Sequence, residues 1–210
     1  MDDLQRIENF FNEKTQLNGY SIKSLDWGSR RTQQIRFHIF SEIASLENKS
    51  ILDVGCGFGD FFDFLNINLG LNVRYTGVDI SSKIVAQAKE RNPNLNIVKL
   101  DILSEEIEKH DYVFGSGIHN IKVEKNDELL ERMLNKMFEL CNYGVATNMI
   151  NKTYENSLAE HIYGYELSKV MEMCKKLTPF SVVRQDYLPN DFTLYLYKHD
   201  WATRSNYEEK

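Results

Sequence analysis

The spacing of hydrophobic residues along the chain changes near residue 50. Before that point apolar residues recur every three or four positions, as Ile35, Ile39, Ile43 and Leu46 do, which is typical of amphipathic helices. We therefore expect residues 1–48 to be mainly helical. The stretch LNGYSIKSLDWGSRR (17–31) carries turn-forming residues and predicts a loop within this region.

From residue 50 onward, short apolar runs alternate with helical patterns. Strands are predicted at ILDVG (51–55), VRYTGVD (73–79), NIVKL (96–100) and DYVFG (111–115). Helices are expected between and after them, at residues 58–69, 81–91, 103–109 and 123–140. This alternation is typical of βαβ units and predicts a parallel sheet.

The last third of the chain predicts a different ending for this sheet. A strand at YGVATNM (143–149) is followed by a helix at 164–177 and by two further strands, SVVRQDY (181–187) and DFTLYLYK (191–198). LPND (188–191) joins these two, and such turn residues favour a hairpin. The sheet should therefore end with an antiparallel pair. We expect one domain, with a helical cap (1–48), a core (49–200) and a tail (201–210).

Composition and charge narrow the class of protein. The chain has 210 residues, of which 42% are hydrophobic, enough for one core, and its net charge of −6 argues against a nucleic-acid partner. The N-terminal MDDLQRIENFFNEK is acidic, so we expect no signal peptide, and no apolar run approaches the ~20 residues of a membrane span. Three scattered cysteines, Cys56, Cys141 and Cys174, fit a reducing cytoplasm.

A glycine-rich turn follows the first predicted strand. Gly55, Gly57 and Gly59 occupy alternate positions, and Asp79 ends the second strand 20 residues beyond Gly59. Ligands of open parallel sheets bind at the carboxyl ends of the strands, where glycines allow close approach of the backbone and an acid can hold ribose hydroxyls. Binders of dinucleotides and of S-adenosylmethionine (SAM) share these features.

The acidic residues of this turn separate the two kinds of ligand. The dinucleotide pattern GxGxxG requires glycine at position 60, where this chain has Asp60. A carboxylate there opposes a pyrophosphate, whereas SAM carries a sulfonium and an ammonium group that Asp53 and an acidic pocket attract. The charge pattern therefore favours SAM. Asp60 could alternatively serve only as a first-turn charge favoured by the helix dipole.

Four motifs together resemble those of the class I SAM-dependent methyltransferases. They are LDVGCGFGD (52–60), GVDIS (77–81), KLDI (99–102) and DYVFGSGIHN (111–120). The resemblance covers about residues 48–198 and implies an α/β fold with a Rossmann-like, seven-stranded, mostly parallel sheet and a reversed last strand, under an N-terminal helical cap. The alternative is a Rossmann-like domain whose glycines only form a tight turn.

The resemblance also implies roles for individual residues. Gly55, Gly57 and Gly59 would line the methionine and ribose part of the cofactor, Asp53 would face its α-amino group, and Asp79 would hold the ribose hydroxyls.

The remaining cofactor contacts implied by the resemblance surround the adenine and the methyl group. Ile80 would pack on the adenine, Asp101 would accept a hydrogen bond from its amino group, and Ile102 would lie beside the ring. Gly115 and Ser116 would lie near the methyl group that is transferred.

A segment before the glycine turn, WGSRRTQQIRF (27–37), resembles the pre-motif segment W-x-S…Q-x-x-R-F of a small bacterial subgroup of these enzymes. Gln33, Arg36 and Phe37 share one helical face, and Arg36 could pair with the cofactor carboxylate. Trp27 could cap the adenosine or anchor the loop. The alternative is a solvated basic turn followed by an ordinary amphipathic helix.

Candidate catalytic groups follow the fourth and fifth strands. The five histidines show no spacing of metal ligands, so we expect no metal. His119 is the best candidate for a general base, with a packing or stacking role as the alternative. His161, Tyr163 and Tyr165 lie in a stretch expected to cover the acceptor, with His161 as a second candidate base; otherwise they are surface-loop aromatics. Asp191, at the start of the last strand, is interpreted as a turn residue rather than a base.

The expected activity is SAM-dependent O-methylation, which yields S-adenosylhomocysteine (SAH). The acceptor would be a small polar metabolite, or a phosphorylated, glycan-related or nucleotide-linked intermediate, since the subgroup includes bacterial enzymes that modify surface polysaccharides. A protein or RNA methyltransferase is an alternative, although the N/D-PPY/F tetrapeptide of amino-group methyltransferases is absent and GSGI (115–118) stands in its place. A further alternative is a SAM-binding regulatory protein without turnover.

Overall fold

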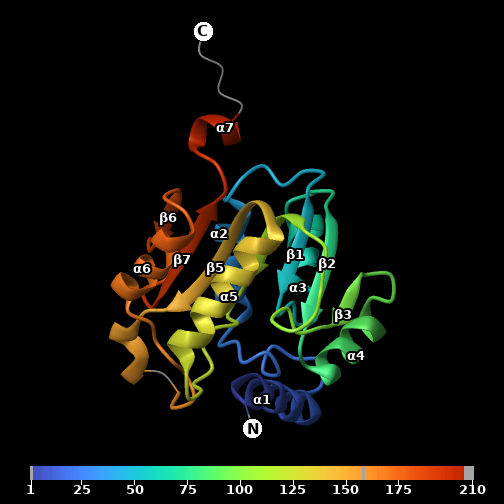
Figure 1. Cartoon of the computed structure of the whole chain (residues 1–210). Coiled ribbons are helices and arrows are strands. Elements are labelled where there is room, and N and C mark those ends of the chain that lie inside the picture. The colour runs from blue at the N-terminus through green and yellow to red at the C-terminus, as the bar shows by residue number, and fades with distance from the viewer. Residues whose placement is uncertain (1, 158, 206–210) are drawn as a thin grey trace.

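The computed structural model of the protein describes residues 2–157 and 159–205 and is built around one central sheet (Figure 1). The seven strands lie in the order β3-β2-β1-β4-β5-β7-β6. They are β1 (Ser50–Val54), β2 (Arg74–Asp79), β3 (Ile97–Lys99), β4 (His110–Gly115), β5 (Cys141–Ile150), β6 (Ser181–Arg184) and β7 (Asp191–Tyr197). Only β7 runs antiparallel to its neighbours β5 and β6. The predicted fold class and its reversed last strand are confirmed.

Helices cover both faces of the sheet, because successive residues of each strand point to opposite sides. One face packs against α2 (Arg30–Ser41), α3 (Asp60–Asp63), the π-helical turn η1 (Phe64–Asn68) and α4 (Ser82–Arg91). The other packs against α5 (Asn126–Leu140) and α6 (Leu167–Leu177). Ile51 and Leu52, adjacent in β1, are both fully buried, one in each of these layers. The molecule is thus a three-layer α/β sandwich.

The first helix has a different position from the others. Helix α1 (Asp3–Asn18) lies across the carboxyl ends of the parallel strands, at the bottom of Figure 1. Asp3 accepts hydrogen bonds from the backbone N–H groups of Glu124 and Lys125, just before α5. Asn12 accepts one from the Ser81 hydroxyl, at the N-terminus of α4 (2.8 Å). Helix α1 is therefore tied to both layers and closes the ligand-binding edge of the sheet, whereas α2 packs on one face.

Some element boundaries differ from those predicted. The helix expected at 103–109 is only a turn: the Asp101 carboxylate accepts hydrogen bonds from the Leu103 N–H and the Ser104 hydroxyl, but β4 begins at His110 and leaves no room for a second helical turn. The helix expected at 58–69 is divided between α3 and η1. A short helix α7 (Trp201–Ser205) begins the predicted tail, whose residues 206–210 lie outside the described part.

The remaining short element is a 3-10 helix, η2 (Lys152–Ser157), after β5. Within the described ranges, none of the helices is both long enough and apolar enough to span a membrane.

Candidate active site

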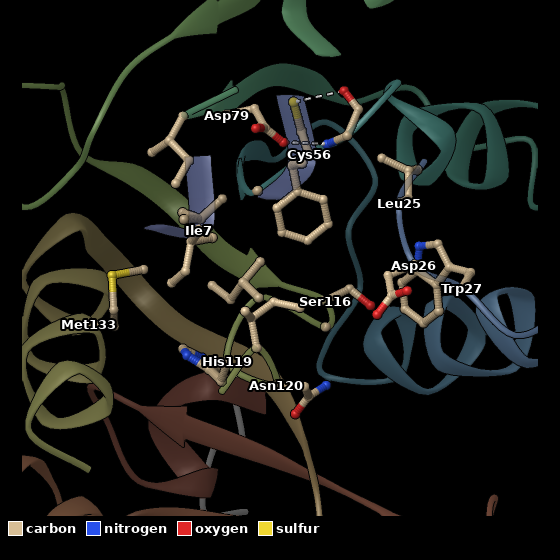
Figure 2. A pocket seen from close by; sticks show the side chains of 18 of the residues that line it. Ile7, Leu25, Asp26, Trp27, Cys56, Asp79, Ser116, His119, Asn120 and Met133 are labelled. Atoms are coloured by element: carbon tan, nitrogen blue, oxygen red, sulfur yellow. Dashed lines mark hydrogen bonds between the residues drawn. The ribbon is translucent and has the colours of Figure 1, made fainter. Parts of the chain in front are cut away.

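A cavity of about 460 Å³ lies at the carboxyl ends of β1, β2 and β4, beneath α1 (Figure 2). Its walls come from α1, the loop before α2, the glycine turn, the ends of β2 and β3, the segment after β4 and residues 159–165. The order of the strands reverses between β1 and β4, and this is where open α/β sheets bind ligands.

The glycine turn after β1 requires glycine for both conformation and space. Gly55, Gly57 and Gly59 have φ values of 65°, 57° and 81°, in the left-handed region that side chains disfavour. A Cβ atom on Gly55 would lie 2.3 Å from Cγ2 of Ile118. Gly55 and Gly57 line the cavity, so the backbone forms that part of its wall.

Asp79 fixes the turn from the end of β2. Its Oδ2 accepts a hydrogen bond from the Gly57 N–H (3.1 Å) and its Oδ1 accepts one from the Ser81 N–H (2.9 Å). Burial raises the pKa of Asp79 to about 6, although these two N–H donors act in the opposite direction. The carboxylate therefore stands at a fixed point of the cavity wall, where the sequence predicts the ribose partner.

Asp53, in β1, has a pKa that is raised further than that of Asp79. It is buried, and the Tyr75 hydroxyl donates a hydrogen bond to it (2.6 Å). Burial raises its pKa to about 7 despite that hydrogen bond, and repulsion from Asp79 and Asp60 adds to the shift. A carboxyl poised near neutrality is sensitive to a bound cation.

The cavity as a whole is acidic. Five aspartates line it, and among its described lining residues Arg36 is the one Lys or Arg. The aspartates are Asp26, Asp53, Asp60, Asp79 and Asp101. This excess of negative charge suits a cationic ligand and opposes a phosphate.

The Asp60 carboxylate is already hydrogen-bonded at the start of α3. Gln33 donates to it (3.1 Å), and it forms ion pairs with Arg30 (3.2 Å) and Arg91 (3.1 Å). Gln33 and Asp60 both line the cavity, but they also hold α2 against α3. This arrangement fits the alternative interpretation of Asp60 as a first-turn charge.

Arg36 forms a two-pronged pair with Asp191. Its Nε and Nη2 atoms both donate to that carboxylate, which also accepts a hydrogen bond from Asn148 (3.2 Å). The guanidinium carbon lies 4.9 Å from the ring centre of Trp27. This contact fits the role of Trp27 as an anchor of its loop. Asp191 is thus the buried first residue of β7 and not a turn residue. Arg36 lines the cavity, but two of its nitrogen atoms already donate hydrogen bonds to Asp191.

The expected adenine end contains Ile80, Asp101 and Ile102, all of which line the cavity. Both carboxylate oxygens of Asp101 accept hydrogen bonds within their own turn, from the Leu103 N–H (2.9 Å) and the Ser104 hydroxyl (2.8 Å). Each oxygen keeps a second lone pair for a ligand donor.

The segment after β4 brings Ser116 and His119 to the cavity (Figure 2). The hydroxyl oxygen of Ser116 is buried and has no hydrogen-bond partner among the described residues, which leaves it for a ligand. His119 Nε2 lies 2.9 Å from the Thr147 hydroxyl, which donates to the Gly115 carbonyl. Nε2 must therefore be the protonated nitrogen.

Burial lowers the pKa of His119 to about 3. The ring is therefore neutral at physiological pH, but its remaining lone pair on Nδ1 is weakly basic. Its proposed role as general base stays a prediction that this environment does not favour.

His161, the second candidate base, meets Asp26. Its Nε2 lies 2.7 Å from Oδ2 of Asp26, and both residues line the cavity. Sequence reasoning did not find Asp26, because a single aspartate in a loop carries no motif. It also missed Leu4, Ile7 and Phe11 of α1, because a helical pattern within residues 1–48 does not show what the helix covers.

Three expected site residues do not line the cavity. Gly59 caps α3, and a Cβ atom there would meet Leu95 and Ile97. Gly115 faces Met137, and neither glycine is among the residues that line the cavity. Tyr163 also lies off the wall, with its hydroxyl 3.1 Å from Asp127.

Tyr165 does line the cavity, but its hydroxyl donates to the His119 carbonyl (2.8 Å). Its substrate role, like that of Tyr163, stays a prediction. In the described part of the chain, no three His, Cys, Asp or Glu residues are grouped as metal ligands would be.

Comparisons with known proteins agree with this geometry. Residues 51–144 match a family model described as a methyltransferase domain. The protein Rv1506c of Mycobacterium tuberculosis, which carries a provisional methyltransferase name, is 27% identical over 158 residues, 71% of this chain and 93% of that protein. An uncharacterized protein of Rickettsia prowazekii is 32% identical over 99 residues, 44% of this chain; the match spans 39% of that relative's length.

Solved structures share the fold at low sequence identity. Magnesium protoporphyrin IX methyltransferase from Synechocystis, solved with bound SAH, has a TM-score of 0.64 at 14% identity, covering 94% of this chain and all of that one. The plantazolicin methyltransferase, solved with SAH and a substrate analogue, has a TM-score of 0.66 at 13% identity, covering 94% and 98%. With the glycine turn, Asp79 and the reversed β7 in place, residues 51–144 match a methyltransferase domain and the chain has the fold of the class I SAM-dependent methyltransferases.

Proposed function

We propose that this protein transfers the methyl group of SAM to an oxygen of a small acceptor. The observation that carries the proposal is one continuous cavity, in which the glycine turn and Asp79 form one part and the segments after β4 and β5, with Ser116, His119 and His161, form another. A cofactor and an acceptor bound there would be brought together by the same walls, which is how positioning lowers the barrier to a displacement.

The residues on the wall fit the cofactor in charge and in hydrogen bonding. Bound SAM would supply a methyl group activated by the positive charge on sulfur. Asp79 would hold the ribose hydroxyls, Asp53 the ammonium group, and the unpartnered hydroxyl of Ser116 would meet the ligand near the end of β4. The acidic lining would stabilise the positive charges of the cofactor.

The size and charge of the cavity support a small acceptor. About 460 Å³ must contain both the cofactor and the reacting part of the acceptor. A glycan-related or nucleotide-linked acceptor remains our proposal. Asp26 and Asp60 are paired with lysine or arginine. Because Asp53, Asp79 and Asp101 have no such partner among the described residues, a phosphate group on the acceptor would have to stay outside the cavity. The cap formed by α1 makes a protein or RNA acceptor the less favoured alternative.

The proposal is tested by binding and then by turnover. Calorimetry should give a dissociation constant for SAM on the order of 1–10 μM, about −7 to −8 kcal/mol, and much weaker binding of NAD. Incubation with SAM and a bacterial metabolite extract should then produce SAH and a methylated small molecule. Equal affinity for NAD would refute the cofactor assignment, and SAM binding without SAH formation would favour the regulatory alternative.

A further inference from the structure

We propose that His161 and Asp26 form the proton-accepting pair of this active site, and that the acceptor therefore presents a neutral hydroxyl group. The inference rests on the proposed function and adds to it the base, its positioning residue and the chemical class of the acceptor. Among the described residues, two histidines line the cavity, and their surroundings assign them different roles.

Asp26 holds the His161 ring by its Nε2 atom. One carboxylate oxygen, Oδ1, forms an ion pair with Lys14 of α1, and the other, Oδ2, lies 2.7 Å from Nε2 of His161. A carboxylate paired with a lysine is an acceptor only, so Nε2 must carry the proton and donate it. The tautomer is thereby fixed, and Nδ1 keeps the lone pair that a base needs.

The imidazole ring of His161 also contacts an aromatic ring of α1. The ring of Phe10 lies 5.2 Å from the His161 ring, centre to centre, and the ammonium group of Lys14 lies 5.0 Å from the Phe10 ring. Phe10 and Lys14 belong to α1, Asp26 to the loop before α2, and His161 to the segment after β5. Three distant parts of the chain thus converge on one imidazole at the cavity wall.

The backbone of Asp26 is strained where its carboxylate meets the histidine. Asp26 has a φ of 58°, and the one other described non-glycine residue with positive φ is Asn48, which does not line the cavity. Glycine would adopt this conformation at lower cost than a residue with a side chain. An aspartate at such a position, bonded to a histidine in the cavity, supports a role of its carboxylate in the site.

His119 does not offer an equivalent base. It is buried, and its Nε2 contacts the neutral Thr147 hydroxyl (2.9 Å), so no negative charge stabilises its imidazolium form. The His161 side chain is about one third exposed, and its Nε2 lies 2.7 Å from the Asp26 carboxylate. His119 can accept a hydrogen bond from the acceptor, and His161 can take its proton.

In the proposed step, His161 on the cavity wall accepts the proton that the acceptor loses. The acceptor oxygen forms a bond to the methyl carbon, and the bond from that carbon to sulfur breaks, with its electron pair going to sulfur to give SAH. The hydroxyl proton moves to Nδ1 of His161, and Asp26 stabilises the imidazolium that results. The proton leaves to solvent through the exposed part of the ring.

This arrangement selects the class of acceptor. A hydroxyl group is neutral before the reaction and must lose a proton during it, so it needs a base. A carboxylate needs no base, and the aspartates of the cavity would repel it. We therefore expect an alcohol or a phenol to be methylated, and a carboxylic acid of the same size to be left unchanged.

The test combines turnover, binding and the tautomer. The full chain, with saturating SAM, is given neutral hydroxyl probes (phenols, simple alcohols and methyl glycosides) and their matched carboxylic acids, and SAH is measured. We expect SAH from the hydroxyl probes only. In His161→Ala and His161→Gln, kcat should fall by roughly 10²–10⁴, with SAM affinity within about threefold of the original. Added imidazole should restore part of the activity of His161→Ala.

Asp26→Asn tests the positioning residue, because asparagine tolerates the left-handed backbone but loses the charge. We expect kcat to fall by roughly 10–100-fold in this variant. In the double variant with His161→Ala, Asp26→Asn should cause no further loss, since it acts only through the histidine. Nitrogen-15 NMR should show a protonated Nε2 on His161 in the original protein and a mixture of tautomers in Asp26→Asn.

His38→Ala is the matched control, because His38 is an exposed histidine of α2 that pairs with a carboxylate, Glu42 (3.4 Å). Its kcat should not change. Failure to bind SAM would refute the proposed function itself. If SAM binds, any of four results would overturn the proposed pair and leave the fold assignment intact. They are a near-normal kcat in His161→Ala, additive losses in the double variant, turnover of the carboxylic acids in place of the hydroxyl probes, and turnover of no probe at all.

Discussion

We expect Asp53 to make cofactor binding depend on pH. Its pKa is raised to about 7, mainly by burial, so at pH 7 about half of the molecules carry it protonated. A cationic ligand favours the ionised form. Binding of SAM must therefore release a proton from the protonated half, and it must release more as the pH falls below the pKa.

We expect SAM affinity to rise between about pH 5.5 and pH 7.5, by up to tenfold per pH unit below the pKa of Asp53. Calorimetry at pH 7 in buffers of different ionisation enthalpy should detect release of about half a proton per SAM bound. Asp53→Asn should bind SAM more weakly and release no proton from this site. Proton uptake by the original protein would show that Asp53 does not face the cationic part of the cofactor.

Asp79 has two structural hydrogen bonds and, as proposed, two ribose hydroxyls to hold. Asp79→Ala should weaken SAM binding on the order of 10–100-fold, which corresponds to about 1–3 kcal/mol for a lost charge-assisted pair. An SAH analogue without the ribose hydroxyls separates the two roles. It should bind the original protein more weakly than SAH does, whereas Asp79→Ala should bind both alike.

Asp186→Ala is the control, because Asp186 is exposed on the β6–β7 hairpin, does not line the cavity and should not alter SAM affinity. If Asp79→Ala still prefers the complete ribose, the hydroxyls are bound elsewhere and Asp79 serves only the glycine turn.

At the level of elements, α2 is attached to the sheet by a buried ion pair. Arg36 of α2 and Asp191 of β7 are both buried, and Asn148 of β5 also contacts the carboxylate. Removing one member of such a pair leaves a buried charge, which typically costs about 3–5 kcal/mol. The pair thus holds α2, and with it the Trp27 loop, against the cavity.

Arg36→Met should therefore lower the free energy of unfolding by about 3–5 kcal/mol, measured by urea denaturation. Adding Asp191→Leu should restore part of this loss, since the buried charge is then removed. Arg184→Met provides the comparison, because Arg184 pairs with half-exposed Glu42 and exposed Asp186 and should cost about 1 kcal/mol or less. An Arg36→Met protein of unchanged stability but much weaker SAM binding would instead support direct pairing with the cofactor.

Elements with local signals were the ones predictable from sequence. The glycine turn, Asp79 and the alternating strands follow from short-range rules of conformation and periodicity. The segment 101–109 shows where such rules end. Asp101, Ser104 and Glu105 make the contacts of a helix start, but the position of β4 stops the helix after one turn. The local sequence does not encode how soon after this turn β4 begins.

The same limit applies to the site. His161 was a candidate because of its place after β5, but Asp26 lies 135 residues away in sequence and only the folded chain brings the two together. Likewise, the apolar face of α1 was visible as a helical pattern, while its position over the cavity depends on hydrogen bonds that Asp3 and Asn12 make to distant helix ends. Contacts between remote polar residues have no periodic signature in sequence.

At the level of the whole molecule, α1 connects the two halves of the sandwich across the cavity. Besides the contacts of Asp3 and Asn12, Glu8 forms an ion pair with Lys99 at the end of β3 (3.5 Å), and Lys14 holds Asp26. The interactions of Glu8, Asn12 and Lys14 are polar and partly exposed, so each contributes little alone. A helix held in this way can open locally without unfolding the sheet, and opening would admit the cofactor.

We therefore expect SAM to protect α1 and residues 19–29 selectively from hydrogen exchange. A ligand that binds the closed form stabilises it by RT ln(1 + [L]/Kd), so SAM at 100 Kd should slow exchange there by up to about 100-fold. Amides in the centre of β5, far from the cap, should change much less. Asn12→Ala, which removes the tie to Ser81 and Lys83, should speed exchange in α1 and raise the SAM dissociation rate measured by stopped flow. If α1 exchanges equally fast with and without SAM while β5 gains protection, SAM binds without closure of α1, and the helix is a fixed wall of the cavity and not its gate.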